Sequence, residues 1–124
     1  MILSEDQNGA IYQIRSVSPD SIKINHDVYY HSLIISPRHL VPHWKPTSIE
    51  TLTDDDLQLL LELKPDIILL GTGKHSIIPS AQKMAVLLNQ QFHCECMSTA
   101  SACRTYAILS AENRNVVAGL ILNQ

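Results

Sequence analysis

Two short segments of this sequence carry residue types that could bind an anion. The first, Gly71-Thr72-Gly73-Lys74, follows the apolar run at residues 67–70. Its glycines leave backbone N–H groups sterically open, and Lys74 adds a positive charge. Ligands of open α/β sheets bind outside the carboxyl ends of the strands, so this segment is expected at a binding crevice. The alternative is a simple tight turn, because the segment lacks the third glycine of a dinucleotide fingerprint and the Gly-Lys-Ser/Thr ending of a phosphate loop.

The second segment, Ser98-Thr99-Ala100-Ser101, follows another predicted strand at residues 93–97. Ser98 or Thr99 is expected to cap a helix, and a helix start offers unpaired donors. Arg104 could supply a counter-charge there; its alternative is a structural salt bridge or a surface charge. Ser98 and Thr99 are interpreted as caps rather than nucleophiles, because no general base stands at a recognisable spacing. We therefore assign no catalytic residue, and the hypothetical anion-binding set is Gly71, Thr72, Gly73, Lys74, Ser98, Thr99 and Arg104.

The cysteines and histidines form no recognisable metal site. Cys94 and Cys96 lie two apart on a predicted strand and therefore share a face. A tetrahedral zinc site needs a second ligand pair, and only Cys103 and scattered histidines remain. His39 and His43 have helical spacing, but neighbouring prolines argue against a helix there. The prediction is three reduced thiols, no metal and no cofactor.

The N-terminal third is expected to form an antiparallel meander. Period-two alternation runs through residues 10–17 and 22–24, and residues 28–36 are rich in β-branched and aromatic side chains. The segments Ser18-Pro19-Asp20-Ser21 and Asn25-His26-Asp27 have turn chemistry. A proline-broken loop follows and contains Trp44, which is interpreted either as a partner anchor or as a plug at the edge of the core.

The remainder predicts a helix followed by a β-α-β-α-β portion. Helices are expected to begin near Thr53, Pro79 and Thr99, and the second is expected to end near Gln91. Apolar strands are expected at residues 66–70, 93–97 and 116–122. This alternation implies a mostly parallel sheet covered on both faces, which the meander either extends or flanks. Residues 1–124 are thus expected to form one α/β domain around a central mixed sheet.

Composition narrows the functional classes. The chain has 124 residues, 45% of them hydrophobic, and a net charge of −3. Its nine basic residues are scattered, so no nucleic-acid partner is expected. It shows no signal peptide and no apolar run of the ~20 residues that span a bilayer, and its three cysteines are an odd number. We expect a cytoplasmic protein without membrane insertion.

The two candidate segments also carry a family resemblance. Residues 65–73, Pro-Asp-Ile-Ile-Leu-Leu-Gly-Thr-Gly, and residues 97–106, Met-Ser-Thr-Ala-Ser-Ala-Cys-Arg-Thr-Tyr, together resemble the MTH-938-like domain family. The resemblance extends from Ser32-Leu33-Ile34-Ile35-Ser36-Pro37 to the closing strand. It implies a three-layer α/β fold around a mixed sheet and no established reaction. The family includes the mitochondrial assembly factor 3 of NADH dehydrogenase, which acts as an assembly partner.

Two functions follow from the sequence. We expect no mitochondrial targeting segment in this chain, which resembles a bacterial stand-alone domain. The first function is a non-enzymatic protein-binding module, similar to an assembly factor, whose partner is another protein. The alternative is a binding protein or enzyme for a small anion, phosphate or carboxylate, that uses the Gly-Thr-Gly loop and the adjacent helix start.

Overall fold

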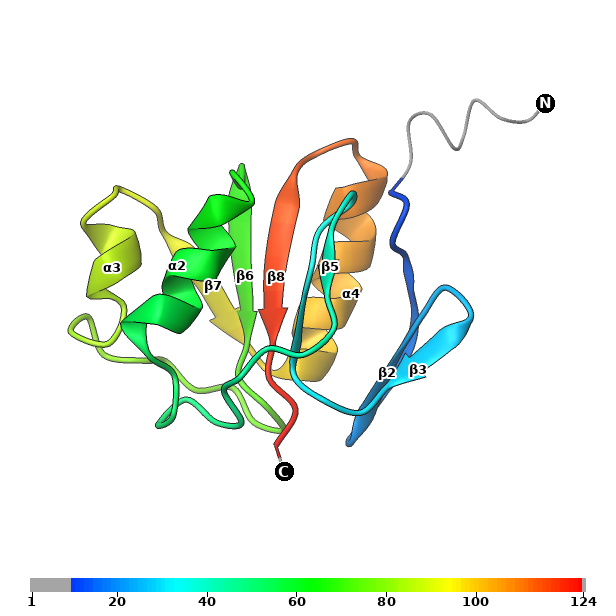
Figure 1. The fold of residues 1–124 in the computed structure, drawn as a ribbon, viewed down its shortest axis with the longest axis horizontal. Helices are drawn as coiled ribbons and strands as arrows, with labels where there is room; N and C mark the ends of the chain where they lie inside the picture. The colour runs from blue at the N-terminus through cyan, green and yellow to red at the C-terminus, as the bar shows by residue number, and fades with distance from the viewer. Residues whose placement is uncertain (1–9, 124) are drawn as a thin grey trace.

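The computed structural model describes residues 10–123, which contain two β-sheets and three α-helices (Figure 1). An antiparallel sheet has the order β1-β2-β3, and a larger sheet has the order β5-β4-β8-β6-β7. The strands of the small sheet are β1 (Ile14–Ser18), β2 (Ser21–Ile24) and β3 (Asp27–Tyr29). Those of the large sheet are β4 (Leu33–Ile35), β5 (Leu40–Val41), β6 (Ile67–Gly71), β7 (Cys94–Met97) and β8 (Val116–Leu120). The helices are α2 (Asp54–Glu62), α3 (Ala85–Leu88) and α4 (Thr99–Ala111).

The large sheet is mixed and is covered on both faces, as predicted. Strand β6 pairs in parallel with β7 and β8, whereas β4 pairs antiparallel with β8 and β5. Residues of α2 and α3 form one core cluster with alternate residues of β6 and β8, and residues of α4 form the other cluster. Every residue of β8 is buried because this strand has helices on both faces and a neighbour on each side.

The meander flanks the large sheet instead of extending it. Residues 28–36, expected to belong to the meander, divide between the two sheets, because the chain leaves the small sheet after β3 and enters the large sheet at β4. Strand β4 is buried on both faces, so its apolar residues belong to the central sheet. The small sheet packs on α4, where Tyr106 Oη donates to the carbonyl of Tyr12 at 2.8 Å.

Two of the three predicted helix starts are confirmed. Thr53 caps α2: the N–H of Asp56 donates to Thr53 Oγ1 at 3.2 Å, and an Asp56 carboxylate oxygen accepts from the Thr53 N–H at 3.0 Å. Ser98 caps α4, since its Oγ accepts from the Ser101 N–H at 3.2 Å. These bonds from the first turn to a capping side chain, reciprocal at Thr53, explain why hydroxyl residues mark helix starts in the sequence.

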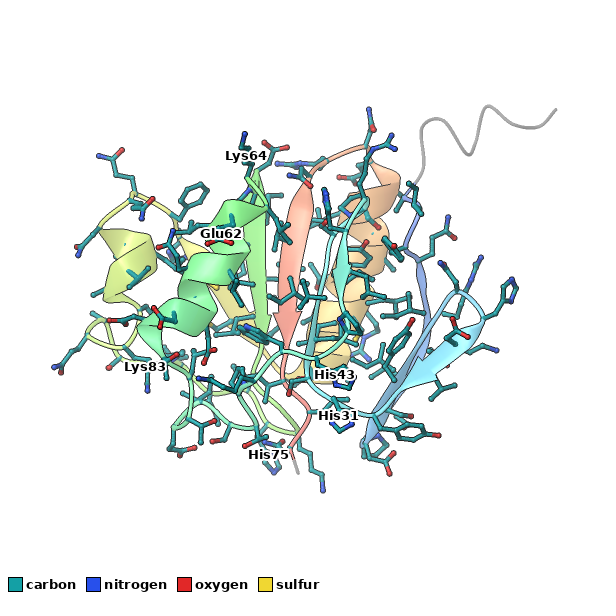
Figure 2. All side chains as sticks on the ribbon, in the orientation of Figure 1. His31, His43, Glu62, Lys64, His75 and Lys83 are labelled. Carbon is teal, nitrogen blue, oxygen red and sulfur yellow. The ribbon has the colours of Figure 1, made fainter. Side chains whose placement is uncertain are left out.

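The second predicted helix is present but shorter than expected: it begins at Ala85 instead of near Pro79 and ends at Leu88 instead of near Gln91. The segment before α3 forms turns, in which the Lys83 N–H bonds the Ser80 side chain. The Lys83 ammonium donates to the carbonyls of Glu50 and Leu52, which lie just before α2 (Figure 2). These local and tertiary hydrogen bonds hold the segment in turns instead of a longer helix. A proline in the first turn favours a helix but does not ensure one.

The proline-broken loop after β4 delivers Trp44 to the core. Its side chain is 3% exposed, and its Nε1–H donates to the carbonyl of Asp56 at 3.3 Å. Trp44 is thus a core residue, and the alternative of a surface anchor is wrong. In the same loop, the His43 ring lies 4.7 Å from the ring of His31, between their centroids (Figure 2).

Candidate functional site

The two candidate segments lie together at the carboxyl edge of the large sheet. Strands β6 and β7 are parallel neighbours, so the residues that follow them meet at the same edge. The Gly73 N–H donates to Thr99 Oγ1 at 2.9 Å, and the Thr99 N–H donates to the Gly73 carbonyl at 2.9 Å. The sequence-based expectation of adjacency therefore agrees with the geometry.

The polar groups of this edge bind one another. Thr99 Oγ1, while accepting from Gly73, donates to the Ile121 carbonyl at 2.6 Å. The Thr72 N–H donates to the Met97 carbonyl, and the Lys74 N–H donates to Asn123 Oδ1 at 3.0 Å. The loop donors that the sequence offered to an anion thus hold strands, helix and C-terminal segment together.

Close approach explains the two glycines. A Cβ at Gly71 would lie 2.9 Å from both the Cα and the Oγ1 of Thr99. Gly73 has a φ of 102°, and a Cβ there would overlap the Asn123 side chain. Both positions therefore require glycine for the packing of this edge.

The seven candidate residues separate into three groups. Gly73, Lys74 and Thr99 line a cavity of about 420 Å³ beside the β1–β2 turn. Gly71 and Thr72 are buried, and Ser98 serves as the helix cap. Arg104 is exposed, with its Nη2 3.2 Å from Ser101 Oγ, and does not line the cavity.

Thr99 should be the residue of this edge on which stability depends most. Thr99→Ala removes two hydrogen bonds and leaves the buried Gly73 N–H unpaired, so the free energy of unfolding should fall by about 1–3 kcal/mol. Thr99→Ser keeps the hydroxyl and should retain most of that stability. Urea unfolding of the two variants measures the difference, and equal midpoints for Thr99→Ala and wild type would contradict this role.

A second feature, an open edge at β7, was missed in the sequence. Strand β7 is the last strand of the large sheet, and it passes behind α2 in Figure 1. The Met97 carbonyl accepts from the Thr72 N–H, so Met97 directs its peptide groups toward β6. Since these groups alternate along a strand, Cys94 and Cys96 direct theirs away from the sheet. The Cys94 carbonyl accepts only a 3.7 Å contact from the Cys96 thiol.

An apolar groove of about 390 Å³ runs beside this edge. It is lined by β7 and by side chains of the preceding loop and α3, among them Ile78, Met84, Leu88 and Phe92. Ile78 is 88% exposed, and Ile77 and Leu88 are also exposed. Exposed large apolar side chains gathered around a groove are typical of an interaction surface. We call this surface, formed by β7, Ile78, Leu88 and Phe92, the β7 groove.

Comparison with known protein families assigns the chain to one of them. A family model described as a protein of unknown function, DUF498/DUF598, matches residues 14–121. The chain belongs to the DUF498/DUF598 family. Among solved structures, a Xanthomonas campestris protein is 33% identical with a TM-score of 0.80, over 98% of this chain and 92% of that one. A Mth938-like domain from Bordetella pertussis is 24% identical with a TM-score of 0.77, over 90% of this chain and 86% of that one, and shows the shared fold.

Two curated relatives of this DUF498/DUF598 protein carry names that bear on function. A Francisella tularensis protein named 13 kDa major membrane protein is 29% identical over 94% of this chain and 95% of its own length. The Drosophila melanogaster NADH dehydrogenase [ubiquinone] 1 alpha subcomplex assembly factor 3 is 28% identical over 87% of this chain. The match covers 57% of the fly protein, so this chain spans little more than half of that relative. In residues 10–123, no helix is long and apolar enough to cross a membrane.

The three thiols of this DUF498/DUF598 protein have different environments. The neighbouring side chain of Cys96 and burial raise the pKa of the Cys94 thiol, whereas the neighbouring side chain of Cys94 lowers the pKa of the Cys96 thiol. Burial raises the pKa of Cys103 to about 12. Within residues 10–123, no group of three or more His, Cys, Asp or Glu side chains could hold a metal ion. The metal-free, reduced state remains a prediction.

Stability should fall in strong alkali because of Cys103. Its thiol keeps the proton in the folded protein, whereas the unfolded chain loses it near the ordinary pKa of 9.0. The stabilisation that the buried, protonated Cys103 thiol gives the folded state is therefore complete below pH 9 and is lost as the pH rises toward 12. Burial also raises the pKa of the Tyr106 hydroxyl, which acts in the same direction. Thermal unfolding from pH 8 to about 11 should show this decline, with a shallower slope for Cys103→Ala; identical slopes would contradict it.

Proposed function

We propose that this protein is a non-enzymatic protein-binding module, similar to an assembly factor, whose partner binds at the β7 groove. The observation that carries the proposal is the open edge of β7 beside exposed apolar side chains. The relative named assembly factor 3 supports it, because its match covers 87% of this chain. The partner is accordingly another protein.

The geometry of β7 favours one mode of binding. An extended segment of the partner adds a strand to β7 and pairs with the outward peptide groups of Cys94 and Cys96. Alternate side chains of that segment then point into the groove beside Leu88 and Phe92. Ile78 gains most from such burial, since it is almost fully exposed in the free protein.

Affinity capture from the native cell at natural expression level tests the proposal. Wild-type protein is compared with Ile78→Asp in the groove and with Ile108→Asp, which alters a residue 63% exposed on α4. We expect one stoichiometric protein to be captured by wild type and Ile108→Asp but not by Ile78→Asp. Capture that is equal for all three baits would place the interaction elsewhere.

A second candidate function is the binding of a small anion at the carboxyl edge. The cavity that contains Gly73, Lys74 and Thr99 favours it, because Lys74 brings a positive charge to an open volume. Gly71, Thr72, Ser98 and Arg104 would then support this site from its periphery. This candidate and the protein-binding module use different surfaces, so one protein can serve both.

We also propose the cytoplasmic location, in a bacterial cell, that the sequence predicts from its odd number of cysteines. The name of the Francisella relative points instead to a membrane fraction. Fractionation of native cells should recover the protein with soluble cytoplasmic markers. Recovery in salt-washed membranes would contradict the location without affecting the β7 groove.

A further inference from the structure

We propose that the cavity at the carboxyl edge binds an amphipathic acid, a single carboxylate carried on an apolar body. The inference rests on the second candidate function and names the chemical class of its ligand. The cavity volume of about 420 Å³ lies in the range of small-molecule sites.

Four segments distant in sequence build the cavity. They are the β1–β2 turn with Val17, the loop after β6 with Lys74, the start of α4 with Ala100, and the segment after β8 with Ile121. The two sheets are separate, so the cavity lies between the turn of the small sheet and the edge of the large one. Figure 1 shows the lower end of the small sheet, the start of α4 and the C-terminal segment on the same side of the molecule.

Half of the lining is apolar. Val17, Pro19 and Ala100 are at least partly exposed and form its accessible wall, whereas Ile121 and Leu122 are buried and can form only its floor. An inorganic anion gains nothing from such a wall. An apolar ligand body gains the free energy of leaving water, about 25 cal/mol for each Å² that it buries.

Among residues 10–123, the polar part of the lining offers one positive charge, that of Lys74, and includes no Asp or Glu side chain. The Gly73 N–H is bonded to Thr99 and the Lys74 N–H to Asn123, so these backbone donors are already used. The Lys74 ammonium forms no ion pair within residues 10–123, where the sole ion pair joins His93 and Glu95. A single ammonium matches one carboxylate, whereas phosphate sites use several converging donors.

Titration of the full-length protein with octanoate, followed by amide chemical shifts, tests the inference. We expect saturable shifts at Gly73, Lys74 and Ala100, and weaker binding of octan-1-ol, which lacks the charge. Lys74→Gln should weaken octanoate binding at least tenfold, whereas Lys23→Gln on β2, outside the cavity, should leave it unchanged. Ala100→Leu, which fills the cavity, should abolish binding while the thermal midpoint stays near that of wild type.

The possible results distinguish this inference from the small-anion candidate on which it rests and from the protein-binding module. Octanoate binding that Lys74→Gln and Ala100→Leu do not change would overturn it. Binding of inorganic phosphate but not octanoate, dependent on Lys74, would overturn the amphipathic ligand and keep the small-anion candidate. Binding of neither would overturn both and leave the protein-binding module at the β7 groove intact.

Discussion

Trp44→Ala should lower the free energy of unfolding by about 3–5 kcal/mol, as expected for a large aromatic side chain removed from a core. The Trp44 ring packs in the cluster that joins α2 to the large sheet, with Leu60 on the helix and Val117 on β8. The substitution also leaves the Asp56 carbonyl without the indole N–H that it accepts. Urea unfolding of the purified variant measures this effect. A loss within ~1 kcal/mol would show that the ring is not part of the core.

The residue of the sheet that packs against the Trp44 ring allows a stricter test of the same contact. A Cβ at Gly119 on β8 would lie 2.6 Å from Cη2 and 2.7 Å from Cζ3 of the Trp44 ring. Gly119→Ala alone should therefore destabilise by about 1–3 kcal/mol through overpacking. In a Trp44→Leu background, Gly119→Ala should cost less, and the coupling energy should be about 0.5–3 kcal/mol. Additive effects would contradict the contact.

Ile78→Asp should have the largest effect on binding of the captured partner. An anchor residue in a groove contributes about 2 kcal/mol or more, so the dissociation constant should rise at least ~30-fold. Stability should change by less than ~0.5 kcal/mol, because Ile78 is 88% exposed in the free protein. Calorimetric titration with the purified partner measures the constant, with Ile108→Asp as the matched control. A change of less than threefold for Ile78→Asp would mean that the groove is not the interface.

The sequence predicted the elements whose signals are local. Thr53 and Ser98 act through side-chain bonds to the next turn, so their helix starts could be located from a few residues. The parallel strands β6, β7 and β8 appear as short apolar runs between these helices. The helix at Pro79 was overestimated because the Lys83 bonds to the carbonyls of Glu50 and Leu52 span more than 30 residues. The division of residues 28–36 between two sheets is likewise determined by tertiary contacts and not by local sequence.

The candidate sites show the same contrast between features with a local sequence signal and features set by distant residues. Adjacency of Gly73 and Thr99 followed from the order of two strands. The bonds that occupy the Lys74 N–H and the Thr99 hydroxyl, however, involve Asn123 and Ile121, about 50 residues away from the loop. The sequence of β7 does not reveal that this strand lies at the edge of the sheet, since its buried neighbour β6 is also short, with five residues against four. The exposed Ile77-Ile78 pair, in a segment interpreted only as the approach to a helix, was the available signal.

Amide hydrogen exchange of the protein, free and bound to its partner, tests the binding mode most directly. In the free protein the N–H groups of Cys94 and Cys96 point away from β6 and should exchange fast, whereas those of Glu95 and Met97 should be protected. Addition of a partner strand should slow exchange at Cys94 and Cys96 at least ~10-fold. Unchanged exchange at both residues, with protection appearing on α4 or the small sheet, would contradict binding at the β7 groove.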